Sequence, residues 1–248
     1  MSHTIDDVLP SDRDGLFVGR LWDPARQLPV PVLLTASGVW ELSSLATTTS
    51  ELFELEDLHH RLNEVAAGEP QWSVEEISLE AEGKEGSPQL LAPLDLQVIK
   101  ACGVTFVGSM VERVIEERSG GDASAAASIR AQMQREVGVD LTTVVPGSEE
   151  AQAVKAALHE RGWWSQYLEV GLGPDPEVFT KAPVLSAVGS GSPIGVPAFS
   201  SWNNPEPELV LVVNSRGQLA GVTLGNDVNL RDVEGRSALL LGIAKDNN

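Results

Sequence analysis

The chain has 248 residues, 42% of them hydrophobic, and a formal net charge of −19 at pH 7. This length and hydrophobic share suffice for a buried core in one large or two modest domains, whereas the acidity argues against binding nucleic acid or an anionic membrane surface. The single cysteine, Cys102, excludes a disulfide within the chain and a cysteine-rich zinc site.

The first part of the chain, residues 1–98, predicts a small N-terminal α/β domain. Two β-rich runs, GLFVGRLW and VPVLLT, lie within residues 15–45 and are separated by turn-forming prolines. Apolar residues at helical spacing then predict one helix within residues 48–68, ending near Gly68. A polar segment rich in glycine and proline follows, so we place a domain boundary near residue 98.

The second part, residues 99–248, predicts a mixture of helices and strands, and the fold class is α+β. The apolar run LQVIKACGVTF predicts a buried strand, and two helices follow within residues 122–138 and 148–162, the first capped by Asp122. From Phe179 onward the composition favours β-structure, including the final segment ALLLGIAKDNN.

The stretch WNNPEPELVLVVNSRGQLAGVTLGND, residues 202–227, predicts a β-hairpin with acidic residues at its open end. If residues 215–216 are the central pair of the turn, Glu206 lies opposite Gly225. Residues two apart on a strand face the same side. Glu206, Glu208 and Asp227 therefore share one face, and Gly225 leaves room between their carboxylates.

Three converging carboxylates repel one another, and each is driven toward protonation unless a cation lies among them. Carboxylate oxygens without sulfur or imidazole suit a hard ion such as Mg²⁺, Mn²⁺ or Ca²⁺. Three protein ligands on an octahedral ion leave positions for water or substrate, which is typical of a catalytic metal. The alternative is a solvated strand edge with scattered acids.

The segments FTKAPVLSAVGSGSPIGVP and SWNNPEPELVLVVNSRGQLAGVTLGNDVNLRDVEGRSALLLGIAKD resemble the fumarylacetoacetate hydrolase superfamily. The resemblance is close over about residues 175–248 and looser from about residue 99. It rests on the Glu-x-Glu pair, the GNDVxxRD segment and a downstream lysine. It implies Mg²⁺ or Mn²⁺ ligands at Glu206, Glu208 and Asp227, an active-site lysine at Lys245, and a supporting arginine at Arg231.

Hydrolytic members of this superfamily commonly carry a His–Glu dyad, but GVTFVGSMVERVIEE, which aligns with the early active-site helix, has no histidine. The pattern is instead similar to the branch that dehydrates 2-keto-3-deoxy sugar acids, such as 2-dehydro-3-deoxy-D-arabinonate. In that branch a glutamate ahead of the metal strands works with the lysine, and Glu177 matches its position. Lys181 is the rival of Lys245 as the catalytic lysine.

The resemblance implies a metal-dependent hydro-lyase that acts on a small 2-keto acid. The alternatives are a C–C bond hydrolase of the fumarylacetoacetate or acylpyruvate type and an inactive, truncated metal-binding relative. Superfamily members continue well past the lysine, whereas this chain ends three residues after Lys245. We therefore expect an incomplete catalytic domain of mixed β-sheet or β-roll type, which is a homo-oligomer when full length. The N-terminal residues lack the features of a signal peptide and no apolar run is long enough to span a membrane, so a cytoplasmic location is expected.

Overall fold

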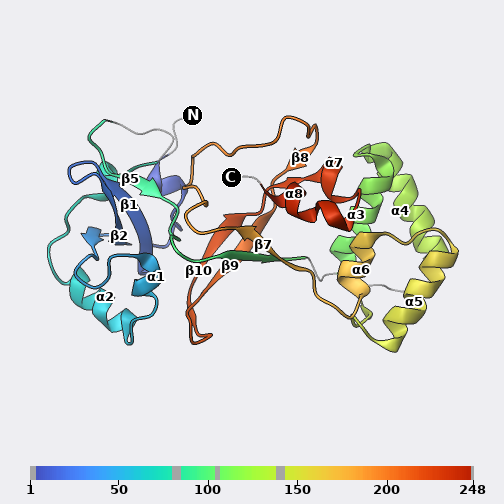
Figure 1. Ribbon diagram of the computed structural model, residues 1–248, viewed down its shortest axis with the longest axis horizontal. Coiled ribbons are helices and arrows are strands. Elements are labelled where there is room, and N and C mark those ends of the chain that lie inside the picture. Colours follow the sequence, from blue (N-terminus) through green and yellow to red (C-terminus); the bar gives the residue numbers. More distant parts are fainter. Residues whose placement is uncertain (1–3, 80–84, 104–106, 138–142, 247–248) are drawn as a thin grey trace.

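The computed structural model describes residues 4–79, 85–103, 107–137 and 143–246. A five-stranded sheet lies at one end of the molecule and a cluster of helices at the other, with the β9–β10 hairpin between them (Figure 1). Helices and a mixed sheet are both present, since one strand pair of the five-stranded sheet is parallel and the others are antiparallel. None of the helices in the described ranges is long and apolar enough to cross a membrane.

The N-terminal sheet has the strand order β3-β2-β1-β5-β4 and packs against an apolar cluster on each face. Its strands are β1 (Phe17–Asp23), β2 (Leu28–Thr35), β3 (Gly38–Glu41), β4 (Ser78–Leu79) and β5 (Gln89–Leu91). The alternation along β2 explains this packing, because Val32 and Leu34 pack with one apolar cluster while Leu33 packs with Leu62 of α2 in another. The two β-rich runs expected within residues 15–45 are confirmed as β1 and β2.

The single helix expected within residues 48–68 is wrong, because two helices form there, α1 (Thr49–Leu52) and α2 (Leu58–Ala66). Asp57 separates them in the left-handed conformation, with a φ of 55°, and a continuous helix cannot pass through that backbone geometry. Short 3₁₀ helices lie at Ile5–Asp7 and Val74–Glu76.

The central helices pack around a core of their own. They are α3 (Val107–Ser119), α4 (Ala123–Val137), α5 (Glu149–Glu160) and α6 (Gln166–Leu172). The core includes Ile115, Leu158 and Leu168, all of them fully buried. Asp122 caps α4 as expected, since its Oδ1 accepts hydrogen bonds from the backbone N–H groups of Ser124 at 2.8 Å and Ala125 at 3.2 Å.

The strand expected at LQVIKACGVTF forms only in part, as β6 (Ile99–Cys102), which pairs with β7 (Val178–Ala182). Its predicted burial is wrong: only Ala101 is buried, because a two-stranded ribbon covers little of its own surface. Residues 104–106 of that run lie outside the described residues.

The C-terminal region contains β8 (Asn203–Asn204), β9 (Pro207–Val213), β10 (Leu219–Asn226), β11 (Asn229–Leu230), α7 (Arg231–Glu234), a 3₁₀ helix (Ala238–Leu240) and α8 (Leu241–Lys245). The β-structure expected for ALLLGIAKDNN is wrong, because the Ser237 side chain accepts from Leu239 N and starts a helical turn instead. The helix then buries Ala244 against Leu230 and Val233, a contact that the local sequence does not reveal.

The hairpin forms as expected, but its register differs from the prediction. Gly225 lies opposite Glu208 rather than Glu206, and the backbone N–H of Asp227 donates to the carbonyl of Glu206 at 2.9 Å. Two irregularities cause the shift. The turn has three residues and ends at Gly217 with a φ of 74°, and a β-bulge adds Ala220 to β10. A Cβ on Gly225 would lie 2.8 Å from Val210, so this glycine accommodates the partner strand.

Candidate metal centre

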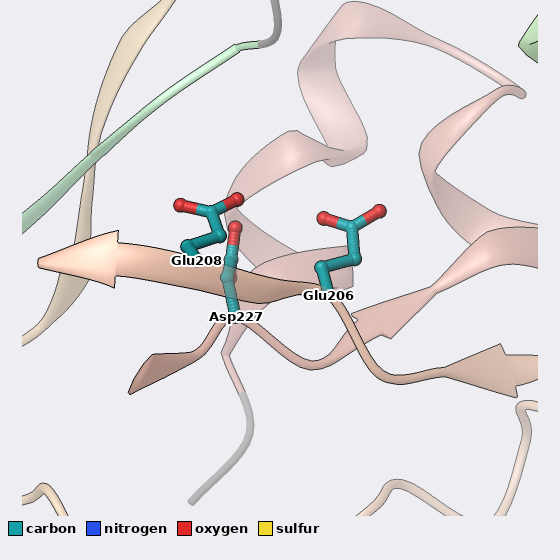
Figure 2. A group of neighbouring side chains, drawn as sticks. All are labelled: Glu206, Glu208 and Asp227. Atoms are coloured by element: carbon teal, nitrogen blue, oxygen red, sulfur yellow. The ribbon is translucent and has the colours of Figure 1, made fainter. Parts of the chain in front are cut away.

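Three carboxylates converge at the open end of the hairpin. One oxygen from each of Glu206, Glu208 and Asp227 lies within 4.8 Å of the others, and all three side chains point to the same side (Figure 2). Asp227 is buried, at 7% exposure, and the two glutamates are half-buried. The structure therefore brings together the three residues that the sequence selected as metal ligands.

Lys245 lies directly against this cluster. Its Nζ donates to Glu206 Oε2 at 2.5 Å and to Asp227 Oδ2 at 2.9 Å, and it lies 3.8 Å from Glu234 Oε1. Lys245 is only 3% exposed. This burial lowers the pKa of Lys245, but attraction to Glu206 and Asp227 outweighs it and leaves the pKa raised. The two carboxylates at hydrogen-bonding distance therefore favour the ammonium form of Lys245.

Lys181, the rival lysine, lies on the other side of Asp227. Its Nζ is 3.3 Å from Asp227 Oδ1, and it donates to the backbone carbonyls of Val228 at 3.1 Å and Lys245 at 2.5 Å. Burial, the strongest influence, lowers the pKa of Lys181 below its ordinary value despite the attraction of Asp227. Both candidate lysines thus reach the cluster, so proximity alone does not choose between them.

Arg231 supports the cluster through Glu234, with which it pairs at 3.2 Å, and it lies 3.8 Å from Glu206. Asn229 donates its side-chain amide to Glu234 at 2.7 Å and to Glu206 at 3.4 Å. Sequence reasoning missed Asn229 and Glu234. The spacing of Arg231 and Glu234, three residues apart on one helical turn, was a signal that could have found the second of these.

Glu177 lies immediately before β7, and its backbone carbonyl accepts a hydrogen bond from Gly103 N at 3.0 Å. Its carboxylate occupies the space that a side chain at 103 would need, since a Cβ there would be 2.4 Å from Glu177 Oε2. Residues two apart in an extended strand share a face, so Glu177 is on the same side of β7 as Lys181. The two residues are four positions apart, so their backbones are separated by roughly 13 Å.

The donor set fits a hard divalent cation. Asp227 Oδ1 is buried and receives no well-formed hydrogen bond, although Lys181 Nζ lies 3.3 Å away, and this leaves acceptor capacity on that oxygen. The three candidate ligands offer only carboxylate oxygens, which Mg²⁺ and Mn²⁺ prefer over the softer ligands that zinc selects.

No family model matches the chain. Two curated proteins are similar to parts of it. A probable 2-keto-3-deoxyxylonate dehydratase of Haloferax volcanii is 40% identical over 98 residues, which cover 40% of this chain and 32% of that protein. A 2-dehydro-3-deoxy-D-arabinonate dehydratase of Saccharolobus solfataricus is 43% identical over 70 residues, which cover 28% of this chain and 24% of that protein. The chain thus spans about a third or less of these relatives in the matched regions.

A solved structure, a hexagonal crystal form of 2-keto-3-deoxyarabinonate dehydratase, has a similar fold. It matches with a TM-score of 0.52 at 20% identity, over 92% of this chain and 62% of that chain. The resemblance to 2-keto-3-deoxy sugar acid dehydratases that the motif indicated is therefore confirmed by similarity of sequence and of fold.

Proposed function

We propose that this chain carries the metal centre of a hydro-lyase that dehydrates a 2-keto-3-deoxy sugar acid. The observation that carries the proposal is the convergence of Glu206, Glu208 and Asp227 beside an ammonium group, in a chain similar to two such dehydratases. The C–C bond hydrolase is the weaker choice, because no histidine of the chain lies in the segment that resembles the hydrolytic site.

Glu206, Glu208 and Asp227 would hold Mg²⁺ or Mn²⁺, which when bound polarises the keto group and stabilises the charge that develops as C3 loses its proton. The chain must then supply a base for the C3 proton and an acid for the departing 4-hydroxyl. Lys245 Nζ holds a proton and suits the acid, and the carboxylate of Glu177 suits the base. Arg231 and Asn229 hold Glu234 and Glu206 in position.

We also propose that the chain divides near residue 98 into the N-terminal domain and a catalytic domain of β-roll type. In support, the N-terminal sheet includes β5, which ends at Leu91, whereas β6 begins at Ile99 and pairs only with β7 among the described strands. Homo-oligomer formation is part of this proposal. One face of the hairpin is apolar and exposed, through three cross-strand pairs: Leu209 with Leu224, Leu211 with Val222, and Val213 with Leu219.

Calorimetric titration of Mg²⁺ into the metal-stripped protein and into Glu208→Gln tests the metal centre. Loss of one charged ligand should weaken binding by about 10-fold or more, and equal affinities would contradict the assignment. Glu177→Gln should bind Mg²⁺ like the parent, because Glu177 is no ligand, yet lower turnover by about 100-fold. Measuring semialdehyde formation against pyruvate release from 2-keto acids separates dehydration from C–C bond hydrolysis.

A further inference from the structure

Lys245 donates to two of the three carboxylates that a cation among the acids would need. Its ammonium nitrogen lies 2.5 Å from Glu206 Oε2 and 2.9 Å from Asp227 Oδ2, and it is almost fully buried. The ammonium group therefore pairs with two of the three carboxylates and offsets one of their negative charges from within the chain. Without it, the repulsion among buried like charges would disfavour the folded hairpin.

We propose that Lys245 is an internal counter-ion that competes with the divalent cation for Glu206 and Asp227 and so sets the metal affinity of the site. This inference rests on the proposed metal-binding function of the three acids. A divalent ion bound to these carboxylates would lie beside the buried ammonium group, and the repulsion between the two positive charges opposes metal binding. Metal binding therefore favours a shift of the Lys245 ammonium group away from Glu206 and Asp227.

The structure provides a place for the withdrawn ammonium group. Glu234 Oε1 is 3.8 Å from Lys245 Nζ and is held in place by Arg231 and Asn229. A lysine at the end of α8 can turn its flexible side chain from Glu206 and Asp227 toward Glu234 and remain paired. The move also frees the ammonium group to serve as the proposed proton donor.

Lys181 is not expected to behave in the same way. It donates to two backbone carbonyls, which metal binding does not consume, and its distance to Asp227 Oδ1 is 3.3 Å. Lys181 can therefore keep both carbonyl contacts when a cation occupies the cluster, whereas Lys245 loses its two closest partners. Of the two lysines, only Lys245 should show strong competition with the metal.

The test measures Mg²⁺ and Mn²⁺ binding by calorimetry on the full chain, after removal of metal, for the parent and for Lys245→Met. We expect Lys245→Met to bind both ions about 10-fold or more tightly, since removing a like charge at this distance changes cation binding on the scale of a pKa unit or more. Its thermal midpoint without metal should fall, and the rise on adding Mg²⁺ should exceed that of the parent. If Lys245 had only a structural role, Lys245→Met would bind Mg²⁺ and Mn²⁺ with the same affinity as the parent or more weakly.

Lys245→Gln is the second variant, because it keeps a hydrogen-bonding group and serves if the methionine variant fails to fold. Lys245→Arg keeps the charge and should bind metal like the parent. Lys100→Met is the matched control, because Lys100 is exposed and donates to Thr180, which is on the opposite face of β7 from Lys181. Equal or weaker affinity in folded Lys245→Met and Lys245→Gln would overturn the inference while leaving the metal centre intact. Failure of the parent and both neutral variants to bind either ion would overturn the metal centre as well, whereas binding by the variants alone would support both.

Discussion

Asp95 connects the end of the N-terminal sheet to helix α1, and its removal tests how that connection stabilises the chain. Its Oδ2 accepts from Thr49 N at 2.8 Å, and its Oδ1 accepts from Ser50 N at 3.1 Å, Ser50 Oγ at 2.6 Å and Leu96 N at 2.7 Å. The residue is 5% exposed, and Arg20 lies 3.7 Å away. Asp95→Asn retains the shape of the side chain but removes its charge and one acceptor oxygen.

We expect this change to lower the free energy of unfolding at pH 7 by about 2–3 kcal/mol, the scale of one hydrogen bond to a charged group together with an unfavourable contact between two N–H groups. Burial raises the pKa of Asp95, but the hydrogen bonds from Ser50, Leu96 and Thr49 outweigh it and leave the pKa below its ordinary value. The carboxylate therefore contributes stability that is fully present above the unfolded-state pKa, near about pH 4, and is lost as the pH falls through the lower folded-state pKa.

Urea unfolding, followed by circular dichroism, measures the free energy of unfolding of the parent and of Asp95→Asn. The two values can be compared if the m-values agree. The gap between the proteins should be constant from pH 5 to 7 and should shrink below about pH 4, where the parent also loses its charge. Asp12→Asn is the matched control, since Asp12 is exposed and its Oδ1 accepts a local hydrogen bond from Asp14 N two residues away. A gap below about 1 kcal/mol at pH 7, or one that does not narrow in acid, would refute the reasoning.

Two further predictions concern the apolar face of the hairpin and the position of the Glu177 carboxylate. Leu211→Glu, on the apolar hairpin face and 56% exposed, should shift sedimentation toward the monomer relative to the parent, whereas Val145→Glu, 65% exposed between α4 and α5, should not. A parent that sediments as a monomer at high concentration would contradict this. Gly103→Ala should displace the carboxylate of Glu177 and reduce turnover by about 10-fold or more without changing Mg²⁺ affinity, because 1 Å of misplacement is costly in catalysis. Full turnover in that variant would show that the position of Glu177 does not matter.

The parts of the fold that could be predicted are those determined by signals within a few residues. The helices expected within residues 122–138 and 148–162 form as α4 and α5, and the cap at Asp122 that starts α4 acts inside one helical turn. The end of the chain could not be predicted in this way. ALLLGIAKDNN is a short apolar run that suits a strand or a buried helix, and its packing against Leu230 and Val233 decides between them.

The candidate site likewise has features that the local sequence predicts and features that depend on tertiary packing. The three acids could be found from strand parity, which is a local property of each strand. Lys181 and Lys245 approach Asp227 from β7 and α8, at sequence separations of 46 and 18 residues, and nothing in either segment specifies that contact. Asn229 could not be assigned for a related reason, since its contacts with Glu206 and Glu234 depend on the turn between β11 and α7.

The three acids share one face, as predicted, although the register of the hairpin differs from the prediction. The three-residue turn and the β-bulge each shift the strand pairing by one residue, and the two shifts together preserve the face. A slip of one residue moves a side chain to the opposite face of a sheet. The three-residue turn alone would place Leu224 opposite Glu208 and turn Asp227 away from the glutamates. The bulge at Ala220 adds a second slip of one residue, so Gly225 lies opposite Glu208, and Asp227 returns to the face of Glu206.

Deleting Ala220 should therefore abolish Mg²⁺ binding, because it would restore a slip of one residue between the two strands. Metal binding that survives the deletion at unchanged affinity would show that the bulge does not align the acids.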